Sequence, residues 1–259
     1  MLSGGLLLIM SATAITTIFF DLGYTLINFE GDVPSVLRKS YRSLAQALIN
    51  SGYSLDSNEF IREYEKIINA YYVVRDIDLV EQPVGDFVNK TLAVLGQPPA
   101  STRVLKEAIA AMFKVTETCW QVEPDAHTTL TKLCAKGYRL GLISNASDLA
   151  DLKRLVKNAG LHKYFKAIVV SAAEKIRKPD PKIFSKALDL MGSTPSSSIM
   201  VGDTLTADIL GAQKSGLRAV WITRRANRPE NTRVQSLVIP DWKITQLSEL
   251  IPLLDSIQK

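Results

Sequence analysis

The sequence is poor in residues that cross-link a fold through disulfides or metal ions. Its 259 residues include two cysteines, Cys119 and Cys134, and two histidines, His127 and His162. Two cysteines without ligand spacing exclude a disulfide framework, and we expect both to be small buried hydrophobic side chains. The scarcity of histidine also argues against a histidine-rich zinc site.

Long apolar runs are missing as well. No apolar stretch approaches the roughly 18 residues that a membrane-spanning helix needs, so we expect no membrane partner. Residues 1–10 contain a short apolar segment, GGLLLIM, but no Lys or Arg precedes it. We therefore interpret residues 1–10 as an N-terminal extension rather than a signal peptide, and we expect a cytoplasmic protein.

The charge balance is only mildly basic. Thirty-one Lys and Arg residues against 26 Asp and Glu residues give a net charge of +5, which admits a small anionic substrate. The most basic stretch, TRRANRPENTR (residues 223–233), lacks interleaved aromatic residues and contains Pro229 and Glu230. It predicts a solvated loop, and we expect no nucleic-acid partner. The sequence leaves the oligomeric state open.

Apolar periodicity divides the chain into two patterns. Residues 14–20 form a short β-branched and aromatic run, typical of a strand buried on both faces. Residues 32–118 then carry apolar side chains every three to four positions, which predicts four helices, one of them capped by Ser57. From residue 122 onward, strands and helices alternate, which predicts a parallel sheet. The expected strands cover residues 139–143, 167–170, 198–201, 219–222 and 236–239, and a helix is expected over 206–215.

The first strand has no partner until the later strands are reached, so residues 11–30 and 121–259 must form one domain. We predict an α/β fold, with a doubly wound, Rossmann-like parallel sheet core and an inserted four-helix cap domain at residues 31–120. The chain passes between the two units only near residues 28–32 and 118–123. The cap is therefore expected to move as a rigid lid.

Polar residues stand at or just beyond the ends of four of these strands. They are Asp21, Ser144, Lys178 and Asp203. Each alone has an ordinary explanation, because Ser or Asp after a strand is most often a helix cap. The carboxyl ends of parallel strands form one rim, however, and ligands bind in the crevice there. We therefore expect two carboxylates, a hydroxyl and an ammonium group to converge.

Four motifs in this order resemble the haloacid dehalogenase-like hydrolase superfamily, in its subfamily I with a C1-type helical cap. The motifs are FFDLGYTL (residues 19–26), LISN (142–145), RKPDPKIF (177–184) and VGDTLTADILGAQKSGL (201–217). The last two are highly specific, and the resemblance covers essentially the whole chain.

The resemblance implies a Mg²⁺-dependent hydrolase of small phosphorylated molecules that forms an aspartyl-phosphate. Asp21 would be the nucleophile, because a carboxylate is already ionised at neutral pH. Lys178 would neutralise charge on Asp21 and on the phosphoryl group. Mg²⁺ prefers hard oxygen ligands. The implied metal-site residues are Asp21, the backbone carbonyl of Gly23, Asp203 and Asp208, the last beside the metal's own ligands or through water.

Substrate contacts are implied at the same rim. Ser144 would bind phosphoryl oxygens as a member of the catalytic set, together with Lys178. The other implied substrate-binding residues are Asn145 and Thr25, the latter also supporting the first loop.

One position departs from the pattern of the family's phosphatases. These proteins usually carry a second Asp in the first motif, which protonates the leaving oxygen, but here the residue is Gly23. Loss of a general acid or base typically costs about 10²–10⁴-fold in rate. The departure weakens the prediction of an enzyme without overturning it.

The alternatives follow from that departure. A 2-haloacid dehalogenase would tolerate Gly23, since a halide leaves without protonation, although GDTLTAD resembles a metal site that dehalogenation does not need. A phosphotransferase such as a mutase and a non-catalytic binding or regulatory protein with the same fold also remain open.

Overall fold

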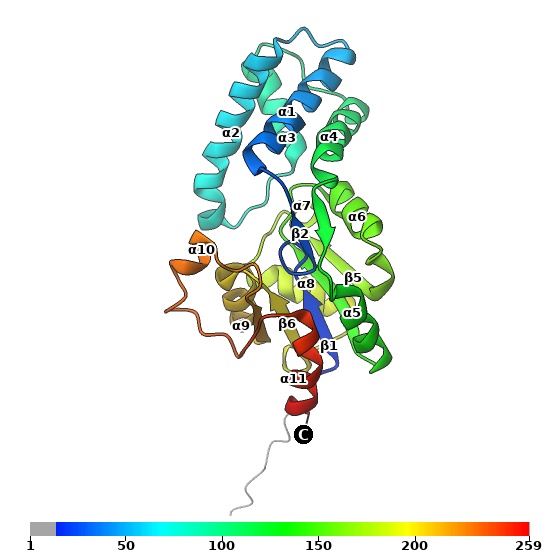
Figure 1. The fold of residues 1–259 in the computed structure, drawn as a ribbon. Coiled ribbons are helices and arrows are strands. Elements are labelled where there is room, and N and C mark those ends of the chain that lie inside the picture. Colours follow the sequence, from blue (N-terminus) through cyan, green and yellow to red (C-terminus); the bar gives the residue numbers. More distant parts are fainter. Residues whose placement is uncertain (1–13, 259) are drawn as a thin grey trace, which may run out of the picture.

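The central sheet has six parallel strands in the order β5-β4-β1-β6-β7-β8 (Figure 1). The computed structural model describes residues 14–258, so the predicted extension at residues 1–10 lies outside the described part. Strand order reverses at β1, the arrangement in which open α/β sheets bind ligands at the carboxyl ends of their strands. The strands are β1 (Thr17–Phe20), β4 (Arg139–Ser144), β5 (Phe165–Val170), β6 (Ser198–Gly202), β7 (Arg218–Ile222) and β8 (Trp242–Ile244).

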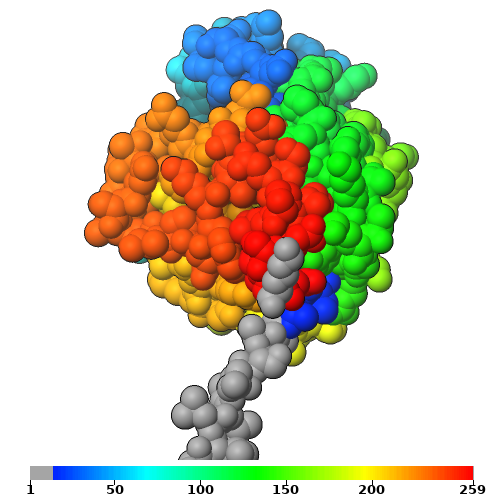
Figure 2. Space-filling view, turned by 60° about the horizontal axis from the view of Figure 1, so that its bottom comes forward, coloured from blue at the N-terminus to red at the C-terminus, as the bar shows by residue number. Residues whose placement is uncertain are grey.

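Helices cover both faces of this sheet, because alternate side chains of the central strand enter different layers. Ile18 and Phe20 of β1 pack with α5 (Ala126–Ala135), α6 (Leu149–Asn158) and α11 (Leu250–Ile257). Figure 2 shows the red C-terminal segment beside the green segment that contains α5. Phe19 packs on the opposite face with α8 (Pro181–Met191) and α9 (Gly211–Lys214). The predicted doubly wound fold is confirmed.

Four helices inserted after β1 form a bundle with its own apolar core. The helices are α1 (Val33–Asn50), α2 (Ser57–Asp78), α3 (Val84–Val94) and α4 (Thr102–Glu117). Asp32 and Ser101 accept hydrogen bonds from the first turns of α1 and α4. Asp56 caps α2 in place of the expected Ser57, which is the first helical residue. We refer to this bundle as the cap.

A two-stranded ribbon carries the chain between cap and core. Strand β2 (Ile27–Phe29) runs antiparallel to β3 (Trp120–Val122). The ribbon contains both expected crossing points, and Figure 1 shows the cap standing above the carboxyl edge of the sheet. The shorter elements are α7 (Ser171–Glu174), α10 (Pro229–Thr232) and the turns His162–Tyr164, Pro195–Ser197, Leu205–Leu210 and Leu247–Glu249.

Three details of the fold differ from the sequence prediction. The last strand is Trp242–Ile244 and not residues 236–239, where Leu237 and Ile239 are exposed. The expected helix at 206–215 is split into a π-helical turn followed by α9. The two cysteines are not buried, since Cys119 is only partly buried and Cys134 is exposed. Between residues 14 and 258, no helix is both long and apolar enough to cross a membrane.

A partly buried charge cluster joins the end of α4 in the cap to α6 in the core. Arg154 donates a hydrogen bond to Glu117 and lies 3.5 Å from an oxygen of Asp151. Burial, helped by the negative charge of Glu117 and opposed by Arg154, raises the pKa of Asp151 to about 8. The native protein therefore holds a proton on Asp151 at neutral pH.

Because the native state holds this proton, we predict that the free energy of unfolding depends on pH. Between the ordinary pKa of Asp151, 3.8, and its native pKa of about 8, the native state keeps a proton that the unfolded state has lost. The free energy of unfolding should therefore fall as pH rises through this window, by up to about 1.4 kcal/mol per pH unit, and level off above it. Asp151→Asn should flatten the dependence in urea unfolding, whereas Asp189→Asn, at an exposed position of α8, should leave it unchanged. Equal slopes in all three proteins would contradict the assignment.

Candidate active site

Three aspartates meet at the carboxyl edge of the sheet. Asp21 directly follows β1, Asp203 directly follows β6, and Asp208 lies in the π-helical turn beyond it. One carboxylate oxygen from each lies within 4.8 Å of the other two. Asp203 and Asp208 are each 1% exposed and Asp21 is 9% exposed. Parallel pairing of β1 with β6 produces this convergence, because it brings the two strand ends side by side.

The close approach of Asp208 depends on a glycine. A Cβ atom at Gly202 would lie 2.3 Å from the Asp208 carboxyl carbon, so no other residue type fits there without displacing that side chain. Asp208 is further fixed by the backbone amide of Thr204, which donates to its Oδ2 at 2.9 Å.

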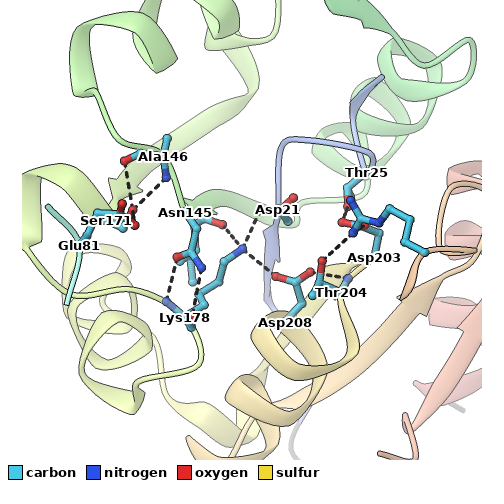
Figure 3. Close-up of polar contacts among 12 residues, drawn as sticks. Asp21, Thr25, Glu81, Asn145, Ala146, Ser171, Lys178, Asp203, Thr204 and Asp208 are labelled. Carbon is cyan, nitrogen blue, oxygen red and sulfur yellow. Dashed lines mark hydrogen bonds and ion pairs between the residues drawn. The ribbon is translucent and has the colours of Figure 1, made fainter. Parts of the chain in front are cut away.

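Lys178 lies between two of the aspartates (Figure 3). Its Nζ donates to Asp21 Oδ1 at 2.6 Å, to Asp208 Oδ1 at 2.7 Å and to the Ile143 carbonyl at 2.7 Å. An ammonium group has three protons, so all of its donors are used. Although burial favours the neutral amine, the charges of Asp208 and Asp21 prevail and raise the pKa of Lys178. Lys178 is therefore a fixed cation, only 2% exposed.

Burial and mutual repulsion disfavour the charged forms of Asp21 and Asp203. Burial raises the pKa of Asp21 to about 6, with Lys178 opposing this rise and Asp208 adding to it. Burial and the charges of Asp208 and Asp21 raise the pKa of Asp203 well above its ordinary value. Clustered carboxylate oxygens are the donors that a hard divalent cation such as Mg²⁺ prefers, and such a cation would relieve their repulsion. The residues present therefore fit a magnesium ion.

Two of the predicted substrate contacts have protein partners instead. The Asn145 amide accepts from the backbone N–H of Lys178 at 2.8 Å and donates to its carbonyl at 2.9 Å, so it holds the Lys178 loop. Thr25 is fully buried and donates to Asp203 Oδ1 at 3.4 Å. Ser144, the last residue of β4, is buried at the same edge. These geometries favour supporting roles for Asn145 and Thr25, and the roles of all three stay predictions.

The position of Gly23 has room for a side chain. A Cβ atom there would lie 3.5 Å from the Trp120 indole, an ordinary van der Waals distance. Tyr24 follows with a φ of 60°, in the left-handed region, and its ring packs edge-on against Trp120 with centroids 5.7 Å apart. The absence of an acid at position 23 is therefore not enforced by local packing.

The basic stretch 223–233 is only partly solvated, whereas the sequence predicts a solvated loop: Arg233 is exposed, but Arg228 and Asn231 turn toward the site. Arg228 donates to Asp203 Oδ2 and to Thr204 Oγ1, and its guanidinium carbon lies 4.7 Å from the centroid of the Tyr24 ring. Arg224 and Arg225 both bind Glu123.

Asn231, from the same stretch, is buried and donates to the Asp203 carbonyl at 2.9 Å. The stretch follows β7 at the same edge of the sheet, but Arg228 lies several residues beyond the end of that strand, so its position relative to the strand did not indicate it.

The fold and the site define an α/β protein whose catalytic edge carries three buried carboxylates and one buried lysine. The family model for haloacid dehalogenase-like hydrolases matches residues 15–216, and the chain belongs to this family. The predicted family is thus confirmed.

Relatives and solved structures match along nearly the whole chain. The glyceraldehyde 3-phosphate phosphatase of Pyrococcus furiosus is 26% identical, over 93% of each chain. The N-acylneuraminate-9-phosphatase of Rattus norvegicus is 29% identical, over 96% of this chain and 97% of its own. A crystal structure of a HAD phosphatase from Thermococcus onnurineus has a TM-score of 0.62 at 26% identity, covering 93% of this chain and 98% of its own. A 2-haloacid dehalogenase from Pseudomonas syringae shares the fold, with a TM-score of 0.64 at 24% identity, covering 95% of this chain and all of its own.

The ion pair of Arg228 with Asp203 predicts competition with a divalent cation. Arg228→Ala should lower the Mg²⁺ concentration that gives half of the maximal rise in melting temperature by about tenfold, or about 1.4 kcal/mol, because it frees a carboxylate oxygen and removes a positive charge. Arg233→Ala, at an exposed position of the same stretch, is the control and should leave that concentration unchanged. Weaker Mg²⁺ binding in Arg228→Ala would show instead that the guanidinium orients Asp203 for the metal.

Proposed function

We propose that this protein is a Mg²⁺-dependent phosphatase that hydrolyses small phosphorylated metabolites through an aspartyl-phosphate on Asp21. The observation that carries the proposal is the Lys178 ammonium group fixed between Asp21 and Asp208, beside Asp203. Phosphoryl transfer depends on positioning and charge compensation, which a rigid cation among carboxylates supplies. The phosphatase names of the Pyrococcus and Rattus relatives support the same reaction class.

Asp21 would act as the nucleophile. Its Oδ1 accepts a hydrogen bond from Lys178, which holds the carboxylate in place for attack on phosphorus. The new Asp21–phosphorus bond forms as the bond to the leaving oxygen breaks. Water then attacks the phosphorus, which releases phosphate and restores the carboxylate.

Mg²⁺ would be held by Asp21, Asp203 and the backbone carbonyl of Gly23, and it would supply charge neutralisation at the phosphoryl oxygens. Asp208 has both carboxylate oxygens engaged, one with Lys178 and one with the Thr204 amide. This supports the prediction that Asp208 acts beside the metal or through water.

A second candidate reaction is 2-haloacid dehalogenation, and Gly23 is the observation that favours it. A halide leaves without a proton, so a site without an acid at position 23 would lose nothing in that reaction. Asp21 would then attack carbon and form an ester. The clustered Asp203 and Asp208 carboxylates argue for the phosphatase, because dehalogenation has no use for a divalent cation.

The metal assignment predicts a stability effect. Millimolar Mg²⁺ should raise the melting temperature, because ligand binding to the folded state stabilises it. Asp203→Asn should lose most of that rise, and Asp189→Asn should keep it. If Mg²⁺ changes neither the melting temperature nor the turnover of p-nitrophenyl phosphate, the phosphatase proposal fails. The 2-haloacid dehalogenation is then the favoured reaction.

Because position 23 carries no acid, we predict that the turnover rate depends steeply on the acidity of the leaving group. Aryl and acyl phosphates should turn over, whereas simple alkyl phosphates should barely react. Gly23→Asp should raise activity on alkyl phosphates by about 10²-fold, the lower end of general acid catalysis, and should help p-nitrophenyl phosphate less.

The control for this substitution is Gly23→Asn, which adds similar bulk next to Trp120 without a proton to donate. Phosphate release from both substrate classes is the measurement. Unchanged or lower activity of Gly23→Asp on every ester would mean that another residue already supplies the proton, or that the site serves a different reaction.

A further inference from the structure

The loop between α2 and α3 ties the cap to the core far from the β2–β3 ribbon. Three backbone hydrogen bonds cross the boundary here. The amide of Glu81 donates to the Lys175 carbonyl at 3.4 Å, and that of Val84 donates to the Ser147 carbonyl at 3.0 Å. In the reverse direction, the amide of Arg177 donates to the Leu79 carbonyl at 3.1 Å. The cap therefore has a non-covalent attachment here, in addition to the two chain crossings and the contact of Glu117 with Arg154.

A single buried carboxylate lies at the centre of this attachment. Glu81 is 4% exposed although it belongs to an inter-helix loop. Its Oε1 accepts from the Tyr71 hydroxyl, within the cap, at 3.0 Å. Its Oε2 accepts from two core side chains, the Ser171 hydroxyl at 2.9 Å and Arg177 Nη1 at 3.1 Å.

Both core partners of Glu81 lie between β5 and α8, in the segment that also carries Lys178. Figure 3 shows Glu81 next to Ser171. Arg177 immediately precedes Lys178. The Ser171 hydroxyl accepts from the backbone amide of Ala146 at 2.9 Å. Ala146 in turn follows Asn145, whose side chain holds both backbone groups of Lys178. The carboxylate of Glu81 thus binds two points of the segment after β5 directly, and Ser171 links it to the loop after β4.

Stability alone is a weak reason for such a contact. Taking a carboxylate and a guanidinium out of water is costly, and apolar side chains of similar size often stabilise a protein better than a buried ion pair. What the ion pair supplies is geometry, because its charge-assisted hydrogen bonds fix the partners in one arrangement. Arg177 also lies 3.4 Å from Asp76 of α2, but Asp76 is largely exposed, so Glu81 is its buried partner.

We propose that Glu81 is a positioning residue: docking of the cap places its carboxylate between Ser171 and Arg177 and thereby fixes Lys178 and, through Ser171, the Ser144–Asn145 segment for catalysis. The proposal deepens the phosphatase function and rests on it for the catalytic part. It makes closure of the cap and assembly of the catalytic groups one event, since the same carboxylate takes part in both. With the cap undocked, Arg177 and Ser171 lose their shared partner.

The first test needs no turnover. Hydrogen exchange is measured for the wild type, Glu81→Ala, Glu81→Gln and the control Glu107→Ala, which removes an exposed cap carboxylate paired with Arg103. Glu81→Ala should accelerate exchange about tenfold or more in the peptides covering 144–147 and 171–178, since loss of a local restraint raises local opening. These peptides include the amides of Ala146 and Lys178, neither of which touches Glu81.

Glu81→Gln keeps the size and the acceptor oxygen for Ser171, so it should accelerate exchange less than Glu81→Ala. If Glu81→Ala does not fold, hydrogen exchange of Glu81→Gln is compared with that of Glu107→Ala. Faster exchange at 144–147 and 171–178 in Glu81→Gln is then the expected result. Exchange that rises only in residues 79–84, or equally throughout the cap helices, would overturn the proposal by showing an ordinary packing role.

The second test is kinetic. With p-nitrophenyl phosphate, Glu81→Ala should lower kcat by about 10²-fold with a smaller change in KM, because misplaced catalytic groups slow the chemical step. Glu81→Gln should recover part of the loss, and Glu107→Ala should match the wild type. A change in KM alone would overturn the positioning role. If the wild type itself turns over no phosphate ester, the proposed function fails, while the exchange experiment still judges the role of Glu81.

Discussion

The ammonium group of Lys178 is the contact on which the geometry of the site depends. It joins the ends of three strands, because its partners are Asp21 after β1, Asp208 beyond β6 and the Ile143 carbonyl in β4. Without this cation, the Arg228 guanidinium would be the one ion-pair partner left to these buried carboxylates within residues 14–258. Desolvation makes buried ion pairs expensive, but here every donor of the ammonium group is satisfied, which is the condition under which such a pair is tolerated.

Part of this site can be predicted from the sequence, because polar residues at the carboxyl ends of parallel strands lie along one edge of the sheet. Asp21, Ser144 and Asp203 stand at strand ends that the apolar pattern locates, so their convergence follows from a parallel sheet alone. The same reasoning includes Lys178, several residues beyond its strand, whereas only the spacing of the family's motifs indicates Asp208. The β8 edge strand was misplaced because it has three residues and one pairing partner, whereas the more apolar segment before it offers a stronger β pattern.

Side-chain partners were much harder to predict than side-chain positions. Asn145 and Thr25 have the polarity of substrate contacts, but the structure gives them protein partners, Lys178 and Asp203. Arg228 was taken for a solvated residue because loop sequences carry no periodicity that tells which side chains turn inward. The burial of Glu81 could not be predicted for the same reason. An acidic residue between two helices has the pattern of a surface turn, and only tertiary packing buries it.

The insertion point of the cap also determines the order in which the chain can fold. Strand β1 pairs with Arg139–Leu142 and Ser198–Val201, which are translated long after it. All four cap helices lie between these segments and have an apolar core of their own. Because local contacts form faster than distant ones and domains fold as units during synthesis, the cap is able to fold while β1 is still unpaired. The apolar Thr17–Phe20 strand then stays unpaired until β4 and β6 emerge, and such an unpaired apolar strand is prone to aggregate during synthesis.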